Sequence, residues 1–271
     1  RTCSAWWYAD HSFGNQDLEK WTSCSEIRHV LETKDHVTIC VESKERTWEL
    51  MIYPVVGGFR MIAGKKGFFD GKPEAFSMEE SEHAYIIRSK EHEMILQKET
   101  LEISIDRKAI TNLKNISFIF EKESVSASRI QFSIHENSAI YGFGERFDSV
   151  NQYGKTVALW QRDACEGCLA SIGNQAYKNI PLVHTSDGFS FFANTSYRMR
   201  MDVGDAVQDY LSVEALGDVF DFYIWSGTPR EAMTAYGTLT GLPIFPPEWV
   251  FEPWAGGGGG LSLIHISEPT R

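Results

Sequence analysis

Hydrophobic and polar residues alternate with a period of two through most of the chain. In the stretch 101–106, Leu101, Ile103 and Ile105 fall on one face, and the stretches 115–122 and 129–136 repeat the pattern. Similar stretches lie at 36–43, 47–54, 83–90, 155–161, 189–196, 198–204 and 219–226. Turn signals such as VGG, DGK, SDG and VGD separate many of them. Many short strands with no helices between them predict an all-β protein, an antiparallel β-sandwich.

One helix is predicted near the C-terminal end of the chain. Thr228 is a suitable N-cap, Pro229 occupies the first helical position and Glu231 lies three residues after the cap, which together form a capping box. Gly241 suits the left-handed position that ends many helices, and Pro243 prevents the helix from continuing.

The segment after this helix begins a different element. Two prolines at 246–247 indicate a stiff joint, and residues 249–254 are predicted to form a short buried strand with Trp249 in the core. Five consecutive glycines then occupy 256–260, where backbone entropy opposes any ordered structure. Residues 261–271 match the translation of a sequencing adapter, so we predict that 256–271 is unstructured and exclude it from the fold.

The composition limits the possible partners. With 271 residues and 42% hydrophobic residues, the chain can fill a globular core. Its formal net charge of −11 repels phosphate backbones, so no nucleic-acid partner is expected. No apolar run approaches the ~20 residues of a membrane span, so no membrane partner is expected. Aromatic residues make up 13% of the chain, and their rings suit either a sandwich core or stacking against sugars.

The five cysteines, at positions 3, 24, 40, 165 and 168, are odd in number and irregularly spaced. This pattern favours reduced thiols over a disulfide framework, and with no secretory signal visible it predicts a cytoplasmic location. The CEGC stretch at 165–168 has no second cysteine pair, so we interpret it as a loop and not as a zinc or redox site. The histidines lack metal-ligand spacing, and no metal or cofactor is predicted.

The stretch YGFGERF at 141–147 first suggests a phosphate-binding loop. A dinucleotide fingerprint requires a third glycine where Phe147 stands, and a helix where the pattern predicts strand. Phosphate binding is therefore rejected. Glu145 and Arg146 are predicted to form a structural ion pair that fixes a turn, and the glycines let the backbone turn without a Cβ clash. A catalytic acid role for Glu145 is the weaker alternative.

Four motifs together carry a resemblance to a known family. They are the Gly-x-Gly-Glu-Arg turn at 142–146, LWQRD at 159–163, AYKNIP at 176–181, and TPREAMTAYGTLTGLPIFPPEW at 228–249. In order and spacing they resemble glycoside hydrolase family 31, the retaining α-glycosidases that include α-glucosidases and α-xylosidases. The resemblance is firmest over 125–255.

The resemblance implies a division of the chain. Residues 1–243 would be the family's N-terminal β-sandwich domain, of the galactose-mutarotase-like kind. Residues 244–255 would be the linker and the start of a (β/α)8 barrel that is truncated here, with the first barrel strand at 249–254. Barrel enzymes carry their active sites at the C-terminal ends of the strands, so the chemistry would lie on the missing part.

The resemblance also limits which residues can be assigned roles. The family's two catalytic aspartates lie on later parts of the barrel, and no position here matches either, so no catalytic residue is assigned. Asp163 matches a loop aspartate that contacts the sugar, where a carboxylate accepts hydrogen bonds from neighbouring hydroxyls; the alternative is a solvated loop residue. Trp160 flanks it, and Trp254 is a candidate to line the sugar pocket. Residues 177–179 are expected to support the loop.

Two functions remain open at this point. The first is the front part of an α-glycosidase whose parent cleaves terminal α-linked glucose or xylose from oligosaccharides, with this fragment inactive because it lacks the carboxyl pair of a retaining hydrolase. The second is a stand-alone carbohydrate-binding or mutarotase-like sandwich. A mutarotase-like epimerase would need a histidine and a glutamate that converge on one face, and His135 and Glu145 are the candidates.

Overall fold

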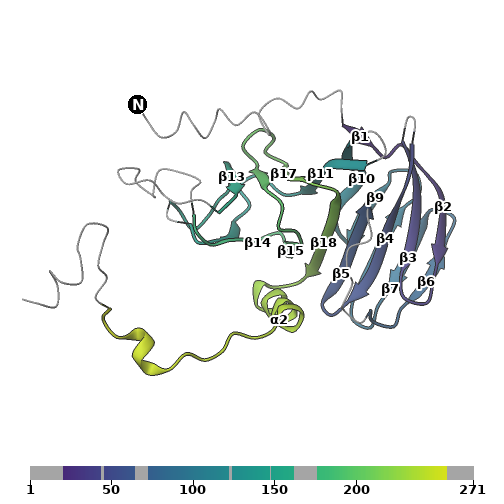
Figure 1. The fold of residues 1–271 in the computed structure, drawn as a ribbon. Coiled ribbons are helices and arrows are strands. Elements are labelled where there is room, and N and C mark those ends of the chain that lie inside the picture. Colours follow the sequence, from purple (N-terminus) through teal and green to yellow (C-terminus); the bar gives the residue numbers. More distant parts are fainter. Residues whose placement is uncertain are drawn as a thin grey trace, which may run out of the picture.

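The computed structural model describes residues 21–43, 46–64, 73–121, 124–146, 148–161 and 176–254. Two antiparallel β-sheets dominate this part of the chain, with a single α-helix near its C-terminal end (Figure 1). The predicted all-β sandwich is confirmed. Each of the ten stretches predicted from alternation contains a strand.

The first sheet has ten strands. In spatial order its main path is β13 (Lys155–Leu159), β16 (Met199–Val203), β17 (Tyr210–Leu216), β11 (Ser124–Ser133), β10 (Lys108–Glu121), β9 (Glu102–Ile105), β8 (Glu93–Gln97), β7 (Ala84–Arg88) and β6 (Ser77–Glu80), and β1 (Thr22–Ser23) also pairs with β10. Most neighbours are joined by short turns, but the β17–β11 pair joins distant parts of the chain, with Ile130 opposite Val213.

The second sheet has eight strands, in the order β12 (Ile140–Gly144), β14 (Asn179–Thr185), β15 (Phe189–Ala193), β18 (Val219–Ser226), β5 (Gly58–Gly64), β4 (Arg46–Val55), β3 (Val37–Ser43) and β2 (Glu26–Glu32). Its central contact pairs β18 with β5, so that Phe222 lies opposite Met61. The two halves of the sheet are therefore joined by residues more than 150 positions apart in the sequence.

The core lies between the sheets and follows the predicted alternation. Leu101, Ile103 and Ile105 are all buried. Aromatic rings from both sheets meet in the middle, where the rings of Phe132 and Phe191 stack with centroids 4.4 Å apart. Because alternate residues of each strand point inward, one buried face per strand is enough to build this core.

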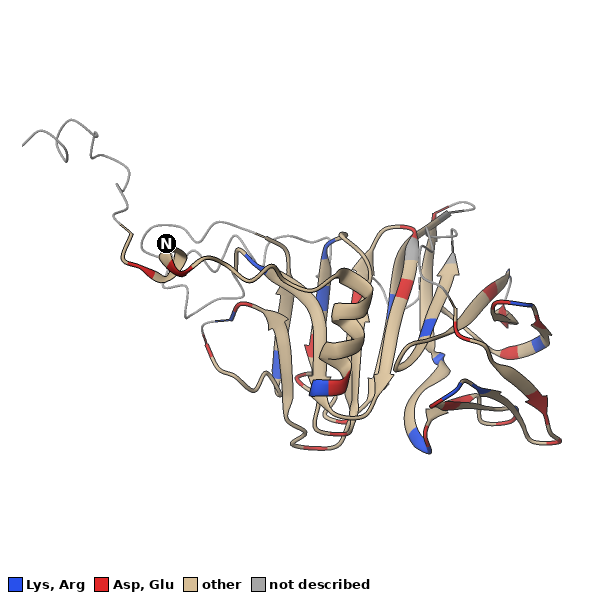
Figure 2. Cartoon of the chain, turned by 90° about the horizontal axis from the view of Figure 1, so that it is seen from below, with Lys and Arg blue, Asp and Glu red and all other residues tan. Residues whose placement is uncertain are grey.

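Acidic and basic side chains are interspersed on the outer positions of the strands (Figure 2). Arg88, for example, bonds Glu79 at 2.6 Å and Glu93 at 2.7 Å across neighbouring strands. Such exposed pairs contribute little to the free energy of unfolding, about 0–1 kcal/mol each. They keep the outer sheet surface polar.

The predicted helix is present as α2 (Pro229–Thr240). Its capping box is confirmed, because Thr228 accepts a hydrogen bond from the backbone N–H of Glu231 while the Glu231 side chain accepts one from the N–H of Thr228. Ala232 and Ala235 are its buried residues and pack on the outer side of the second sheet. Gly241 has a positive φ of 88° but an extended ψ of 152°, so the predicted left-handed cap is not formed.

The segment after α2 differs from the prediction. Residues 248–251 form a short 3-10 helix, η3 (Glu248–Phe251), in place of the expected buried strand, and Trp249 is exposed instead of lying in the core. A strand requires hydrogen-bonding neighbours, and the segment extends away from both sheets (Figure 1). Within the described residues, no helix combines the length and apolar character needed to cross a bilayer.

Candidate functional site

The turn that ends β12 owes its shape to three successive residues with positive φ. Gly142, Phe143 and Gly144 have φ values of 114°, 67° and 84°. A Cβ on Gly142 would lie 2.2 Å from the carbonyl oxygen of Leu182, and one on Gly144 would lie 2.0 Å from that of Lys178. The glycines are therefore required because β12 lies directly against the backbone of β14. The sequence predicted this role.

The side chain of Arg146 holds this turn to its neighbours. Its guanidinium donates to Asn179 Oδ1 at 2.5 Å and to the carbonyl oxygen of Ala158 at 3.2 Å. Burial lowers the pKa of Arg146 to about 10, so the group stays protonated at neutral pH. Glu145 contributes through its backbone N–H, which donates to the carbonyl oxygen of Lys178 at 2.8 Å. The turn is therefore fixed by bonds to residues on other parts of the chain. Glu145 and Arg146 both belong to the described range 124–146, and the predicted ion pair between their adjacent side chains is not formed.

The predicted supporting role of residues 177–179 rests on Asn179. Its side-chain oxygen accepts from Arg146, and its side-chain N–H donates to the carbonyl oxygen of Ala176 at 3.0 Å. Ala176 itself forms a bridge with Gln161. A continuous series of contacts thus links the β12 turn to Ala176, just before β14, and to Gln161, just after β13.

An ion pair stabilises the loop that follows the turn. Asp148 accepts a hydrogen bond from Lys155 Nζ at 2.6 Å and another from the N–H of Ser149 at 2.7 Å. Partial burial would raise the pKa of Asp148, but Lys155 and the other donors outweigh it and lower that pKa to about 2. The loop and the turn line an open hollow of about 440 Å³, beside the exposed ring of Tyr141.

Trp160 is a large aromatic residue whose ring is exposed to solvent. It follows β13, its side chain is 46% exposed, and the guanidinium of Arg198 lies 5.9 Å from its ring centroid. An exposed aromatic face next to a hydrogen-bond donor is suited to stacking on the C–H face of a sugar. Asp163 and the CEGC stretch at 165–168 lie outside the described residues.

Trp254 does not share a site with Trp160. Its side chain is 69% exposed, its ring centroid lies 5.5 Å from that of Trp249, and its indole N–H donates to the carbonyl oxygen of Val250 at 3.1 Å. The segment that carries these residues extends away from the sandwich (Figure 1). Of the three predicted sugar-binding residues, the structure places only Trp160 on the body of the sandwich.

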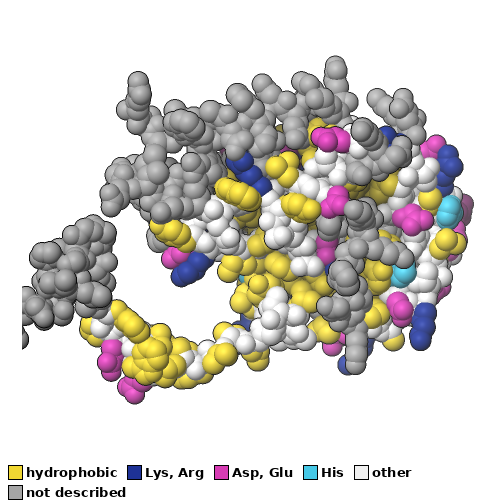
Figure 3. Space-filling view, viewed as in Figure 1, with side chains coloured by type: hydrophobic (Ala, Val, Ile, Leu, Met, Phe, Trp, Pro, Cys, Tyr) yellow, Lys and Arg dark blue, Asp and Glu magenta, His cyan; other side chains and the backbone are white. Residues whose placement is uncertain are grey.

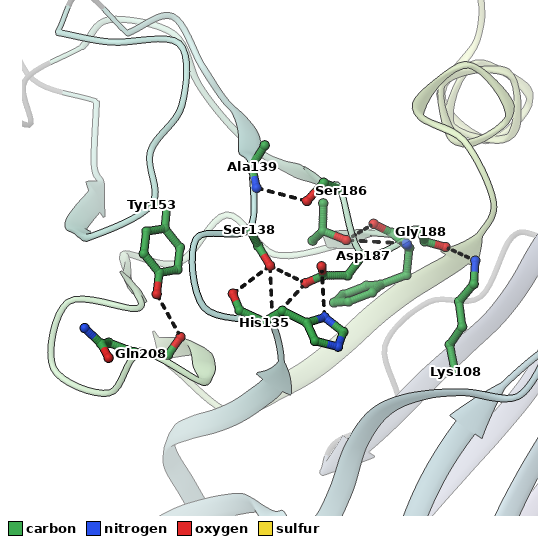
Figure 4. A network of polar contacts seen from close by, with 11 residues as sticks. Lys108, His135, Ser138, Ala139, Tyr153, Ser186, Asp187, Gly188 and Gln208 are labelled. Atoms are coloured by element: carbon green, nitrogen blue, oxygen red, sulfur yellow. Dashed lines mark hydrogen bonds and ion pairs between the residues drawn. The ribbon is translucent and has the colours of Figure 1, made fainter.

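A polar network missed at the sequence level ties the β11–β12 loop to the β14–β15 turn (Figure 4). Asp187 accepts a hydrogen bond from Ser138 at 2.7 Å through one carboxylate oxygen, and its other oxygen lies 3.1 Å from Nδ1 of His135. The carboxylate lies between the hydroxyl and the imidazole, so the serine has no histidine base and the network does not form a nucleophilic triad. The SDG turn at 186–188 was the only signal in the sequence.

The same geometry bears on the epimerase alternative. His135 precedes β12 and Glu145 follows it, so the whole five-residue strand separates them. His135 contacts Asp187 beyond one end of β14, whereas the backbone N–H of Glu145 bonds Lys178 before its other end. Because the paired strands β12 and β14 separate them, the two residues do not converge on one face.

The fold and the site together define the class of protein. Two large antiparallel sheets form a sandwich, with the exposed ring of Trp160 directly after β13. Residues 31–202 match the family model of the glycosyl hydrolase 31 N-terminal galactose mutarotase-like domain. The chain belongs to glycoside hydrolase family 31.

Curated relatives support this assignment. Over 131 residues the chain is 34% identical to an α-xylosidase of Lactiplantibacillus pentosus, an alignment that covers 48% of this chain and 16% of the relative. It is 24% identical over 181 residues to α-glucosidase 2 of Bacillus thermoamyloliquefaciens, covering 64% of this chain and 22% of the relative. The chain therefore spans about a fifth or less of the length of these relatives.

Solved structures share the fold. The cycloalternan-forming enzyme of Listeria monocytogenes, in complex with a pentasaccharide substrate, superposes with a TM-score of 0.75 at 18% identity and covers 85% of this chain and 23% of that one. A family 31 dextranase of Flavobacterium johnsoniae, complexed with isomaltotriose, gives a TM-score of 0.63 at 20% identity over 84% of this chain and 29% of that one. At these identities the likeness concerns the fold alone.

Proposed function

We propose that this chain is the N-terminal part of a retaining α-glycosidase whose complete form releases terminal α-linked glucose or xylose from oligosaccharides. The match of residues 31–202 to the N-terminal domain of family 31 carries the proposal. The names of the relatives, which include an α-xylosidase and an α-glucosidase, support the choice of substrate.

The proposed division of the complete protein places a β-sandwich at 1–243, a joint leading into a (β/α)8 barrel at 244–255, and residues 256–271 outside the fold. The apolar side chains of the joint support it. Ile244 and Phe245 are more than nine-tenths exposed, and hydrophobic side chains also gather on the face that carries α2 (Figure 3). Apolar groups left in water at such density favour burial against a further body, here the chain's own barrel.

Three residues are proposed to contact the substrate from the N-terminal side. The exposed ring of Trp160 would stack on a sugar, the carboxylate of Asp163 would accept hydrogen bonds from vicinal hydroxyls, and Trp254 would line the pocket once the barrel surrounds it. The observed exposure of both tryptophan rings supports this role. None of the three would break a bond.

The bond-breaking groups are proposed to lie on the barrel. Retaining hydrolysis requires a nucleophilic carboxylate and a carboxylic acid about 5–5.5 Å apart. Sugar contacts alone cannot stabilise the oxocarbenium-like transition state, so the chain by itself should be inactive. We place the complete protein in the cytoplasm, where reduced thiols persist; Cys24 and Cys40 are free and buried.

The test compares this chain with a version extended through a complete family 31 barrel, both assayed on 4-nitrophenyl α-glucoside and α-xyloside. We expect turnover only from the extended protein, and its preference between the two substrates identifies the sugar. In the extended protein, Trp160→Ala should raise KM more than it lowers kcat, since ring stacking contributes to the ground state and the transition state alike. Hydrolysis by the short chain would refute the proposal.

A further inference from the structure

The outer face of the first sheet carries a polar hollow of about 180 Å³ across β11, β17 and β16. Strand pairing aligns its residues in two rows. Arg129, Glu214 and Arg200 lie side by side in one row, and Gln131, Ser212 and Asp202 form the next. The inward neighbours of these residues, such as Ile130 and Val213, are buried in the core, so the rows point outward.

The charges of the hollow balance within it. Two guanidinium groups, from Arg129 and Arg200, accompany two carboxylates, from Glu214 and Asp202. Arg129 bonds Glu214 through Nε at 2.9 Å and Nη2 at 2.8 Å, and Asp202 accepts from the backbone N–H of Asp205 at 3.0 Å. The lining therefore gives no overall electrostatic preference for anions or cations, which is compatible with a neutral ligand.

Groups suited to hydroxyls are available between the charges. In the part of the chain that the structure describes, the side chains of Gln131, Ser212 and Tyr210 form no hydrogen bond with protein, although all three are half-buried and line the hollow. An amide and two hydroxyls can each donate and accept, as a ligand rich in hydroxyl groups requires. The half-buried setting means that ligand contacts would replace bound water on a preformed surface.

Two tryptophans flank this surface. The guanidinium of Arg129 lies 4.0 Å from the ring centroid of Trp21, at the β11 side of the hollow. At the β16 side, Arg198 lies two residues before Arg200 on the same face and contacts Trp160. Each ring has a guanidinium over it and neither ring lines the hollow, so the two tryptophans mark the edges of the polar surface.

We propose that this hollow is a binding site for a neutral oligosaccharide, formed by the sheet itself and independent of any barrel. Gln131, Ser212 and Tyr210 bind hydroxyl groups, and the Arg129–Glu214 pair fixes the floor. The site would hold a sugar chain on the enzyme without cleaving it. It differs from the proposed substrate contacts, because it lies on strands and not on the loop after Trp160.

The test titrates the full chain with isomaltotriose and maltotriose and follows backbone amide resonances by NMR. We expect a dissociation constant on the order of 1 mM, as suits a shallow site with few contacts, and shifts centred on β11, β16 and β17. The double variant Gln131→Ala/Ser212→Ala should weaken binding at least about fivefold, as expected for the loss of neutral hydrogen bonds.

A matched control is available on the same sheet. Gln97 and Ser104 are likewise half-buried and outward-facing, on β8 and β9, away from the hollow. Gln97→Ala/Ser104→Ala should leave the affinity within about twofold, with both double variants unfolding at similar temperatures. The proposal would be overturned if both double variants weakened binding equally, or if the shifts were confined to Trp160 and its loop. It would also be overturned if inorganic phosphate bound more tightly, or if no binding were seen at 20 mM, a concentration roughly twentyfold above the expected constant.

Discussion

Burial differs sharply between two regions of the chain. One is the second sheet with its helix α2, and the other is the segment 242–254. In the sheet, even charged groups are covered and paired: Arg60 is 1% exposed and bonds both carboxylate oxygens of Asp221, at 2.7 and 2.5 Å. In the segment, Phe245 is 91% exposed although it is fully apolar. The difference lies in available neighbours. The sheet has strands on both sides of β18, whereas the segment 242–254 belongs to neither sheet and most of its side chains are exposed.

The largest effect is expected at the buried ion pair of the sheet. Asp221→Ala would leave Arg60 buried without its carboxylate, and would leave Asn194 without the oxygen to which it donates at 2.8 Å. We expect a loss of about 3–5 kcal/mol in the free energy of unfolding, measured by urea denaturation. Glu79→Ala, which breaks an exposed pair with Arg88, should cost about 0–1 kcal/mol. If both variants lost similar free energy of unfolding, the expected difference between buried and exposed ion pairs would be wrong.

The next effect is expected at the β12 turn of the same sheet. Gly144→Ala would combine a φ of 84° with a Cβ placed 2.0 Å from the carbonyl oxygen of Lys178, and should cost about 3 kcal/mol. Gly154→Ala is the control, because its φ is 76° but no heavy atom lies within 4 Å of the new Cβ. It should cost about 1 kcal/mol, the conformational penalty alone. Equal losses would show that the close approach of β14 is not what requires glycine.

A pH-dependent effect is expected at Asp148, which follows the turn. Its pKa is lowered to about 2 in the folded chain, so its ionised form contributes stability above the unfolded pKa near 4, and that contribution disappears as the pH falls towards 2. Asp148→Asn should therefore destabilise the chain at pH 7 and cost less and less on acidification. Asp209→Asn, at an exposed carboxylate, is the control. A difference between Asp148→Asn and the parent that stayed constant from pH 7 to pH 2 would refute this.

A smaller effect is expected at the start of α2. Thr228→Ala removes the side-chain acceptor of the capping box and should cost about 1 kcal/mol. Thr238→Ala, inside the same helix and exposed, should change stability by no more than a few tenths of a kcal/mol, in the favourable direction because alanine is the better helix former. Thermal unfolding followed by circular dichroism distinguishes the two variants, and the reverse order would break the assignment of the cap.

The smallest effect is expected in the open segment. Trp249→Ser should change the free energy of unfolding of this chain by less than about 0.5 kcal/mol, since the ring is exposed and packs only on Trp254 among the described aromatic contacts. In a protein extended through the barrel, the same substitution should cost several-fold more if the segment becomes buried there. A large loss already in the short chain would show that the segment packs on the sandwich.

The sequence allowed much of the fold to be predicted, but not all strands. Strands with clean alternation, such as β9 and β16, were predicted, and their inward residues are buried. β17 was missed although its residues alternate, and β14 was missed because Pro181 interrupts its pattern. The structure accommodates this proline opposite the register shift between Gly142 and Gly144, where its missing N–H leaves no ladder bond unmade. The site was predicted less completely, because Trp160 is recognisable by motif whereas the neighbours of Asp187 come from a distant loop.

The sequence was enough to fix the sandwich class and the capped helix, because each depends on residues adjacent along the chain or on a period of two. Tertiary contacts brought Arg60 to Asp221, 161 positions away, and set the backbone of β14 against the glycines of β12. They also left residues 248–251 as an exposed 3-10 helix where a strand had been predicted. Propensity and pattern act locally, whereas strand pairing and burial depend on which distant surfaces come together.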